Sequence, residues 1–290
     1  MQYLTYQKES IDLTKLSIDE LNYLNFKEEN HFALEIKKLE PFSKKRFHYM
    51  KEAYKKIFII SNEKKSRLNQ KTYGATNASI NLLKILVKQQ NINVFYEAGV
   101  ANLFAIKQLD FLDKNKIYGC DIFLENNLKK GYKNIHENDL YHDLLNLPDN
   151  FIDFFYADNV MEHIVEDEYQ ETLKLIVKKM KKGGLLYFII PNLYNGPDDA
   201  SKYALKRGEK ACCFHFMQRS YKDNINDFYS YGLRVKYDAI YIKSNEIKVF
   251  KSNKLTEQIK IFFEKMIAKE TKYHLLKRLG YDIYILEKKW

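Results

Sequence analysis

The segment most informative about the architecture is Val94-Phe95-Tyr96-Glu97-Ala98-Gly99-Val100-Ala101-Asn102. A short apolar run ends here in a carboxylate and a glycine, and a helical pattern over 101–110 follows. In open α/β sheets, ligands bind outside the carboxyl ends of the strands, where glycine lets the backbone approach the ligand. The free N–H groups at the start of the next helix suit a carboxylate or phosphate. The segment therefore predicts a strand, a ligand-binding turn and a helix.

The same alternation of strands and helices continues on both sides of this turn. Continuous apolar runs predict strands, and apolar residues at helical spacing predict the helices between them. The predicted strands are 93–97, 116–121, 152–157 and 185–190, with a short strand near 134–137. The predicted helices are 77–90, 101–110, 124–131 and 165–181, the last ended by Gly183-Gly184. This pattern predicts an α/β fold with a parallel sheet covered on both faces.

Further patterns on either side of this core divide the chain into three predicted regions. Residues 1–75 form a helical N-terminal region, 76–192 the ligand-binding core, and 193–290 a cap with the strands that complete the sheet. Within the last region we expect an irregular insertion over 193–218, helices over 221–231 and 254–278, and strands over 233–242 and 281–287.

Composition narrows the class of protein. The 290 residues include 48 Lys and Arg against 38 Asp and Glu, and the net charge of +10 permits an anionic partner without requiring one. Apolar residues make up 46% and charged residues 30%, which excludes a disordered or membrane-embedded chain. The three cysteines form neither a disulfide framework nor a zinc motif, and no apolar run reaches the roughly 20 residues of a membrane span. We expect a cytoplasmic protein with no membrane span.

Asp121 closes the second predicted strand. An acidic side chain at that position can accept hydrogen bonds from the two hydroxyls of a ribose. Together with the glycine turn it points to a nucleotide-type ligand, although many α/β folds contain a turn and a later aspartate.

Five elements in order resemble a known family. They are Tyr96-Glu-Ala-Gly99, Tyr118-Gly-Cys-Asp121, the run from Asp143 to Asp153, Val160-Met-Glu-His-Ile164, and Met180-Lys-Lys-Gly-Gly184 followed by 185–192. Over 76–243 their order and spacing resemble the class I S-adenosylmethionine (SAM) dependent methyltransferases, within these the methyltransferase type 11/12-like group. The resemblance implies a Rossmann-like sheet, SAM as the methyl donor and S-adenosylhomocysteine (SAH) as the product.

The resemblance also implies roles for single residues. The loop that holds the methionine part of SAM would contain Glu97, Ala98 and Gly99. Farther along the chain, Asp121 would bind the ribose, Ile122 would pack on the adenine, Asp143 would contact the adenine amino group, and Asp158 would lie near the sulfonium. The family loop usually has glycines where this chain has Ala101 and Leu103. These departures predict a tighter or displaced helix start. SAM affinity is the property that we expect them to alter first.

The pair Glu162-His163, with His215 downstream, is the predicted catalytic group. Methylation of a hydroxyl needs a base, and imidazole, with an unperturbed pKa near 6.5, is a natural one. We expect His215 to act as base or ligand. Metal-dependent O-methyltransferases of similar fold use a Glu-x-x-Glu-His segment and a distant His, but Asn159 replaces the first Glu here. We therefore predict no metal at these three residues, with a divalent ion as the alternative.

The predicted reaction is O-methylation of a small polar acceptor. A sugar or phosphoramidate in the biosynthesis of a bacterial surface polysaccharide, such as a capsule, is the expected substrate class, by analogy of fold and composition. One alternative is an RNA methyltransferase that uses the basic cluster between Lys44 and Arg67. A solvent-exposed helix face would explain this cluster equally well. Another is a non-catalytic subunit with a SAM-binding fold, because of Ala101 and Leu103.

Overall fold

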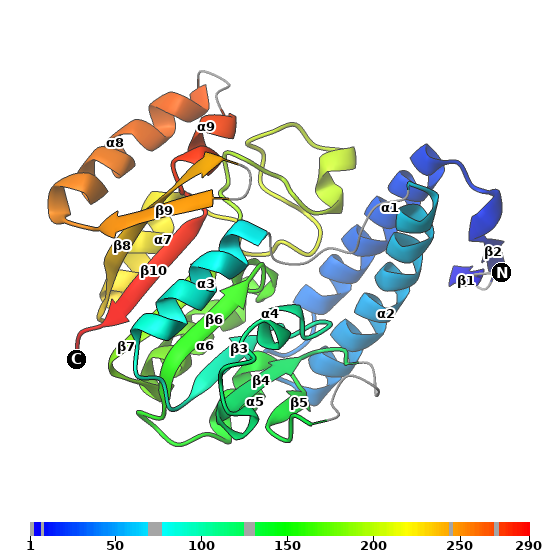
Figure 1. Cartoon of the computed structure of the whole chain (residues 1–290). Helices are drawn as coiled ribbons and strands as arrows, with labels where there is room; N and C mark the ends of the chain where they lie inside the picture. Colours follow the sequence, from blue (N-terminus) through cyan, green and yellow to red (C-terminus); the bar gives the residue numbers. More distant parts are fainter. Residues whose placement is uncertain (1–2, 7–8, 69–76, 125–130, 244–245, 270–272) are drawn as a thin grey trace.

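The computed structural model describes residues 3–6, 9–68, 77–124, 131–243, 246–269 and 273–290. In this part of the chain the central sheet has eight strands in the order β5-β4-β3-β6-β7-β10-β8-β9 (Figure 1). Their bounds are β3 (Phe95–Ala98), β4 (Ile117–Asp121), β5 (Ile135–Glu137), β6 (Ile152–Asp158), β7 (Met180–Ile189), β8 (Leu233–Lys243), β9 (Glu246–Lys251) and β10 (Ile283–Lys288). The first five strands are parallel to their neighbours among themselves, whereas β10 is antiparallel to β7 and β8. The predicted α/β class and the short strand near 134–137 are confirmed.

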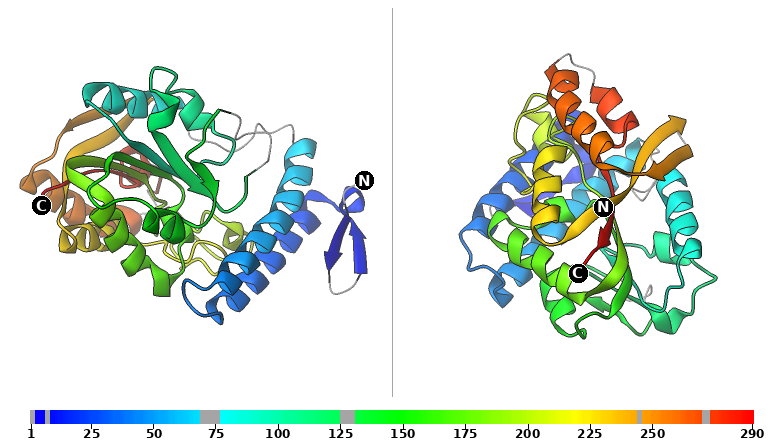
Figure 2. Two further views of the ribbon diagram at one scale, coloured as in Figure 1. Left: turned by 90° about the horizontal axis from the view of Figure 1, so that it is seen from below. Right: turned by 90° about the vertical axis from the view of Figure 1, so that its left-hand side faces the viewer.

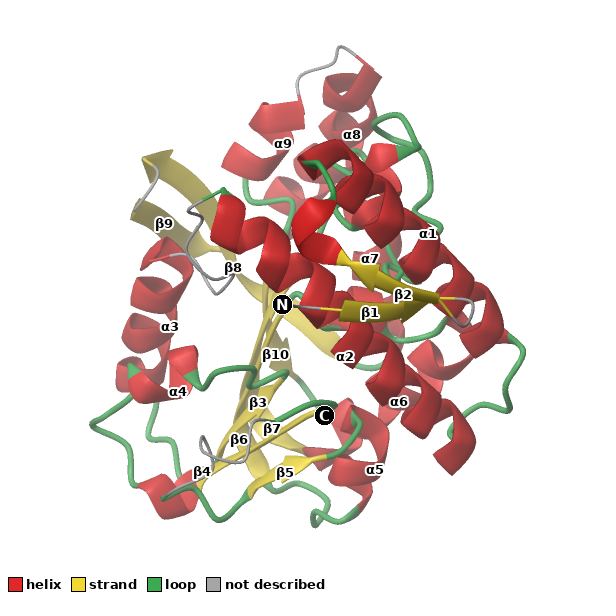
Figure 3. Cartoon of the chain, turned by 90° about the vertical axis from the view of Figure 1, so that its right-hand side faces the viewer, coloured by secondary structure: helices red, strands yellow, loops and turns green. Residues whose placement is uncertain are grey.

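Helices cover both faces of the sheet (Figure 3). One face carries α3 (Asn77–Gln89) and α4 (Phe104–Lys107), and the other carries α5 (Leu140–Leu145), α6 (Glu166–Lys179) and α7 (Tyr221–Ser230). Adjacent strand residues alternate between the two layers. Phe95 stacks on Phe154 in the first layer, at 5.8 Å between ring centroids, and Tyr96 stacks on Phe155 in the second, at 5.1 Å. Because both faces are buried, the strands read as continuous apolar runs.

Two N-terminal helices, α1 (Ile18–Lys37) and α2 (Lys44–Arg67), form a pair beyond the carboxyl edge of the parallel strands (Figure 1). A capping box between Ser17 and Glu20 starts α1. The buried faces of both helices pack on Val165, Phe214 and Phe216 of the core. A hairpin of β1 (Tyr3–Tyr6) and β2 (Glu9–Asp12), in a region where we predicted helix, lies on the side of this pair away from the sheet (Figure 2).

Two predicted helix boundaries were wrong. The helix expected over 101–110 is only α4, because Ala101 and Leu103 have left-handed backbones, with φ of 42° and 60°. The helix expected to stop at Gly183-Gly184 ends at Lys179, and β7 runs through both glycines. The carbonyl at the end of this helix accepts a hydrogen bond from outside the helix: the N–H of Phe151 donates to the carbonyl oxygen of Lys179 at 2.8 Å.

The C-terminal region completes the sheet at its antiparallel edge. The single helix predicted over 254–278 is two helices, α8 (Lys254–Lys269) and α9 (Tyr273–Arg278), and β9 is an edge strand that we did not predict. The helix predicted over 124–131 lies almost wholly outside the described residues. Of the helices in the described ranges, none is both long and apolar enough to cross a bilayer.

Candidate active site

A cavity of about 290 Å³ lies at the carboxyl ends of the parallel strands. The loops after β3, β4, β5 and β6 contribute to its wall, and α2 closes it from outside the sheet. From the predicted site, the residues that line it are Gly99, Asp121, Ile122, Asp158 and His163. The structure thus brings together residues from three strand ends, as expected for ligand binding in an open α/β sheet.

The glycine loop keeps a glycine-like path although only one glycine is present. Gly99 has a φ of 70°, and a Cβ there would lie 2.5 Å from Cγ2 of Val160. Ala101 and Leu103 adopt the same left-handed region, which disfavours residues with a Cβ by roughly 1–2 kcal/mol each. The predicted displacement of the helix start is confirmed, because α4 begins only at Phe104.

Asp121 sits at the end of β4 and faces the cavity. Its Oδ2 accepts the N–H of Ala101 at 2.8 Å, and its Oδ1 accepts the N–H of Phe123 at 3.1 Å. Each carboxylate oxygen has a second lone pair that remains suitable for a ligand hydroxyl. Burial raises the pKa of this carboxyl, against the lowering effect of its backbone donors.

Glu97 and Ala98 are placed beneath the loop rather than on the cavity wall. The side chain of Glu97 is 5% exposed, and its Oε2 has no hydrogen-bond partner. Burial, together with the nearby charges of Asp158 and Asp121, raises the pKa of Glu97 well above its usual value. Burial beneath the turn therefore favours the neutral form of this carboxyl, close to where the loop turns toward the ligand.

Asp143 lies outside the cavity lining, on α5. Its Oδ2 accepts the Tyr96 hydroxyl at 2.7 Å, and its Oδ1 is 2.8 Å from Nδ1 of His136. The cavity wall at this place is formed by residues 138–140 instead. Asp139 caps the start of α5, so the chain turns past the cavity one helical turn before Asp143.

Asp158 closes β6 and lines the cavity. The Tyr156 hydroxyl donates to its Oδ2 at 3.1 Å, and the Asn159 amide donates to its Oδ1 at 2.7 Å. Burial raises the pKa of Asp158 to about 6. The carboxyl is therefore mostly ionised at neutral pH and can face a positively charged ligand.

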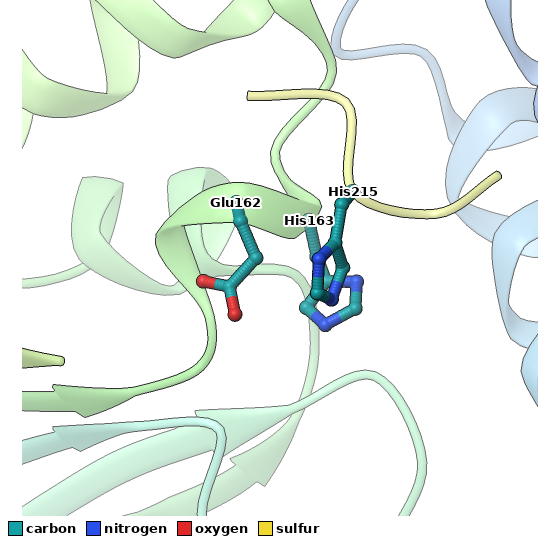
Figure 4. A group of neighbouring side chains, drawn as sticks. All are labelled: Glu162, His163 and His215. Atoms are coloured by element: carbon teal, nitrogen blue, oxygen red, sulfur yellow. The ribbon is translucent and has the colours of Figure 1, made fainter. Parts of the chain in front are cut away.

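Glu162, His163 and His215 form one cluster beside this cavity (Figure 4). The first two belong to a 3-10 turn, and His215 arrives from the predicted insertion. One ligand-type atom from each residue lies within 4.8 Å of the others, a set that could hold a divalent ion. The imidazoles of His163 and His215 meet edge to face at 4.8 Å between ring centroids.

Burial sets the charge of this cluster. It lowers the pKa of His163 to about 3 and that of His215 to about 4, and it raises the pKa of Glu162 well above its usual value. At neutral pH both imidazoles are therefore uncharged, and a ring nitrogen of each can accept a hydrogen bond.

Comparison with known proteins identifies the domain. Residues 97–188 match the family model described as a methyltransferase domain. Residues 97–188 therefore carry a methyltransferase domain. For this domain the predicted methyltransferase activity, with SAM as the methyl donor, is confirmed. None of the curated proteins matches the chain in sequence.

Solved structures with a similar fold have low sequence identity. One is a SAM-dependent methyltransferase from Archaeoglobus fulgidus, with 15% identity, coverage of 72% of this chain and 94% of that chain, and a TM-score of 0.42. Another is the 1,6-didemethyltoxoflavin N1-methyltransferase of Burkholderia thailandensis with bound SAH, with 9% identity, 60% and 76% coverage and a TM-score of 0.43. A third is the [4+2]-cyclase SpnF, with 10% identity, 76% and 84% coverage and a TM-score of 0.41.

The cavity of the methyltransferase domain also contains residues that the sequence did not single out. Met50 and Tyr54 reach it from α2. The ring of Tyr54 lies 5.0 Å from that of Phe214, between centroids, and 6.1 Å from that of His163. Their amphipathic helix was visible in the sequence, but its partner surface was not.

Proposed function

We propose that this methyltransferase domain transfers the methyl group of SAM to an oxygen of a small polar acceptor. The supporting observation is that one cavity is lined both by Asp121, a carboxylate suited to ribose hydroxyls, and by His163 of the buried cluster. When bound, SAM supplies an electrophilic methyl group on a sulfonium. The chain's own contribution is to orient the two reactants and to receive the hydroxyl proton.

The residues present fit the cofactor. We assign the backbone turn at Gly99 to the methionine part, with the buried carboxyl of Glu97 beneath it. Asp121 offers its remaining lone pairs to the ribose hydroxyls, with Ile122 on the adenine. The adenine edge then meets the wall at 138–140, and Asp158 places negative charge toward the sulfonium.

The acceptor is activated at the cluster of Glu162, His163 and His215. The hydroxyl would give its proton to a group of this cluster as the new oxygen–carbon bond forms. The sulfur–carbon bond of bound SAM would break with its electron pair staying on sulfur, which would leave SAH. The Nδ1 atom of His215 is buried and has no hydrogen-bond partner, so it is available to this chemistry.

A small acceptor suits a site covered by helices. Because Met50 and Tyr54 of α2 form part of the cavity wall, we favour a sugar or phosphoramidate of a bacterial surface-glycan pathway over a large polymer. The three cysteines, all unpaired, suit the cytoplasmic setting that we propose.

The RNA alternative is supported less by the structure. Several cations of the α2 cluster are engaged within the chain: Arg46 pairs with Asp167, Lys51 with Glu137, and Arg67 with Glu63. RNA binding by this surface would weaken steeply with added salt, because bound counterions are released.

Calorimetric titration with SAM and SAH tests the proposal. We expect saturable binding of both ligands, and a loss of about 10- to 100-fold in Asp121→Asn, which removes charge-assisted acceptors from the ribose site. Circular dichroism of the variant controls for folding. Mass spectrometry over a panel of sugars, sugar phosphates and phosphoramidates then seeks a methylated product. Absence of binding to both ligands would reject the proposal, and binding without turnover would favour the non-catalytic alternative.

A further inference from the structure

Helix α8 lies on the outside of the molecule, at the end of the sheet away from α1 and α2 (Figure 1). Its apolar side chains at i, i+4, i+7, i+8 and i+11 share one face and are 42% to 66% exposed: Leu255, Ile259, Phe262, Phe263 and Met266. An amphipathic helix of a globular protein normally turns such a face to the core. Single exposed apolar residues are common, but a row of five on one helix indicates a contact surface.

The polar face of α8 is the one that packs on the rest of the chain. Glu264 is buried, and its carboxylate accepts the side-chain amide of Asn192 at 2.7 Å and the backbone N–H of Lys222 at 3.2 Å. Nζ of Lys260 lies 3.0 Å from Oδ1 of the buried Asp238. Because a buried charge that loses its partner is costly, these contacts fix the rotation of the helix and keep the apolar row outside.

The exposed charges beside this row are positive. Lys254, Lys265 and Lys269 are exposed, and their positions at i, i+11 and i+15 follow one edge of the row. Within the described part of the chain, none of these three amines forms an ion pair. The two acidic residues of α8, Glu257 and Glu264, turn inward, where their carboxylates accept hydrogen bonds from other elements. The outer side of α8 therefore combines an apolar row with a basic edge.

We propose that α8 docks this protein on the surface of an anionic phospholipid bilayer. An apolar helical face rich in Phe and Leu with lysines beside it is the pattern of helices that lie in a membrane interface rather than across it. Charge complementarity selects the occupant, because anionic headgroups attract lysines near the surface. A second copy of this chain would instead bring another row of lysines, with no outward acid on α8 to pair with them.

Docking is separate from the chemistry of the cavity. No residue of α8 lines the cavity at the carboxyl ends of the parallel strands. The apolar row therefore enters the bilayer without displacing a residue of the cofactor site, and the inference does not depend on which acceptor is methylated.

The experiment is co-sedimentation of the full chain with large unilamellar vesicles, of phosphatidylcholine alone or with about 30% phosphatidylglycerol. We expect saturable binding to the anionic vesicles and at least about 10-fold weaker binding to phosphatidylcholine alone. Added salt should weaken the binding, because it screens the lysine charges. Phe262→Trp in a Trp290→Phe chain, which then has a single Trp, should be quenched by lipids with a spin label on the acyl chain.

Two paired substitutions separate the contributions of the row and of its edge. Phe262→Ser with Phe263→Ser removes apolar anchors, and Lys265→Gln with Lys269→Gln removes positive charge. We expect each pair to lower the affinity for anionic vesicles by about 10-fold or more. All four positions are exposed, so circular dichroism and SAM titration should give the wild-type result.

The matched control uses the same residue classes far from α8. Leu34 on α1 is 53% exposed, and Lys45 on α2 is exposed. The substitutions Leu34→Ser and Lys45→Gln should leave vesicle binding as in the wild-type chain.

Four outcomes would overturn the inference: no binding of the wild-type chain to anionic vesicles, equal binding to both kinds of vesicle, unchanged affinity in both α8 variants, or an equal loss in the control variants. Light scattering of the vesicle-free protein tests the other occupant. A dimer that is lost in the Phe262→Ser, Phe263→Ser variant would assign the row to a second copy of this chain and reject the membrane.

Discussion

The carboxylate of Asp121 holds Ala101 in its left-handed conformation, with 2.8 Å between Oδ2 and the backbone nitrogen. A side chain at the end of β4 thus fixes the backbone of the loop that follows β3. This contact explains how the loop keeps the path of a glycine-rich turn at a position where the family pattern has glycine and this chain has alanine.

Replacing Ala101 by glycine should stabilise the protein. Ala101 is exposed and has a φ of 42°, so Ala101→Gly relieves backbone strain without removing packed surface. We expect the free energy of unfolding to rise by about 0.5–1 kcal/mol, after the entropic cost of glycine. Urea denaturation measures the change. Ala204→Gly is the control, because Ala204 is exposed with a φ of −127° and should lose stability. A loss of stability in both variants would contradict the strain argument.

The buried carboxyl of Glu97 should make the apo protein less stable at high pH. Its pKa in the folded protein is raised well above the unfolded value by burial. An acid with a raised pKa contributes stability fully below the unfolded pKa, and this contribution is lost as pH rises toward the folded pKa. Glu97→Gln keeps the neutral form at every pH. Its thermal midpoint should therefore exceed that of the wild-type chain at pH 8 and match it near pH 4.5, and an equal difference at both pH values would refute the assignment.

Asp158 should discriminate SAM from SAH in a pH-dependent way. SAM carries a sulfonium charge that SAH lacks, and only the ionised carboxyl attracts it. Since burial raises the pKa of Asp158 to about 6, the preference for SAM over SAH should fall by roughly 10-fold between pH 7.5 and pH 5, about the 1.4 kcal/mol of a modest charge interaction. Calorimetry at both pH values measures the ratio. In Asp158→Asn the ratio should not depend on pH, and a persistent dependence there would point to another group.

Arg46 should be essential for docking α2 on the core. The side chain is buried, with Nη1 and Nη2 at 2.6 and 2.9 Å from the Asp167 carboxylate and with Glu168 at 3.0 Å from Nη1. Arg46→Ala leaves two acidic groups without their partner, and we expect a loss of about 3–5 kcal/mol. Lys45→Ala, at the exposed neighbouring position, should stay within about 0.5 kcal/mol in the same urea denaturation. Equal effects of the two substitutions would contradict the docking role.

Local pattern predicted much of the core. The strand before Gly99 and the strand ending at Asp121 follow from apolar runs buried on both faces, and the displaced helix start follows from Ala101 and Leu103. Asp143 shows the limit of this reasoning, because the family resemblance placed it at the adenine, whereas the cap at Asp139 turns the chain into α5 first. The helix end at Lys179 was missed for a similar reason, since N–H groups distant in sequence take its last carbonyls.

The sequence by itself determined the alternation of strands and helices, the ligand-binding turn after β3, and the set of acidic residues at strand ends. Those features depend on neighbouring residues and on the period of apolar side chains, which a single chain displays. Tertiary structure alone decided that Met50 and Tyr54 of α2 line the cavity, and it set the geometry in which His215 meets Glu162 and His163, the group expected from the resemblance. Such contacts join segments far apart in the chain, and they are fixed by packing and burial that no local pattern encodes.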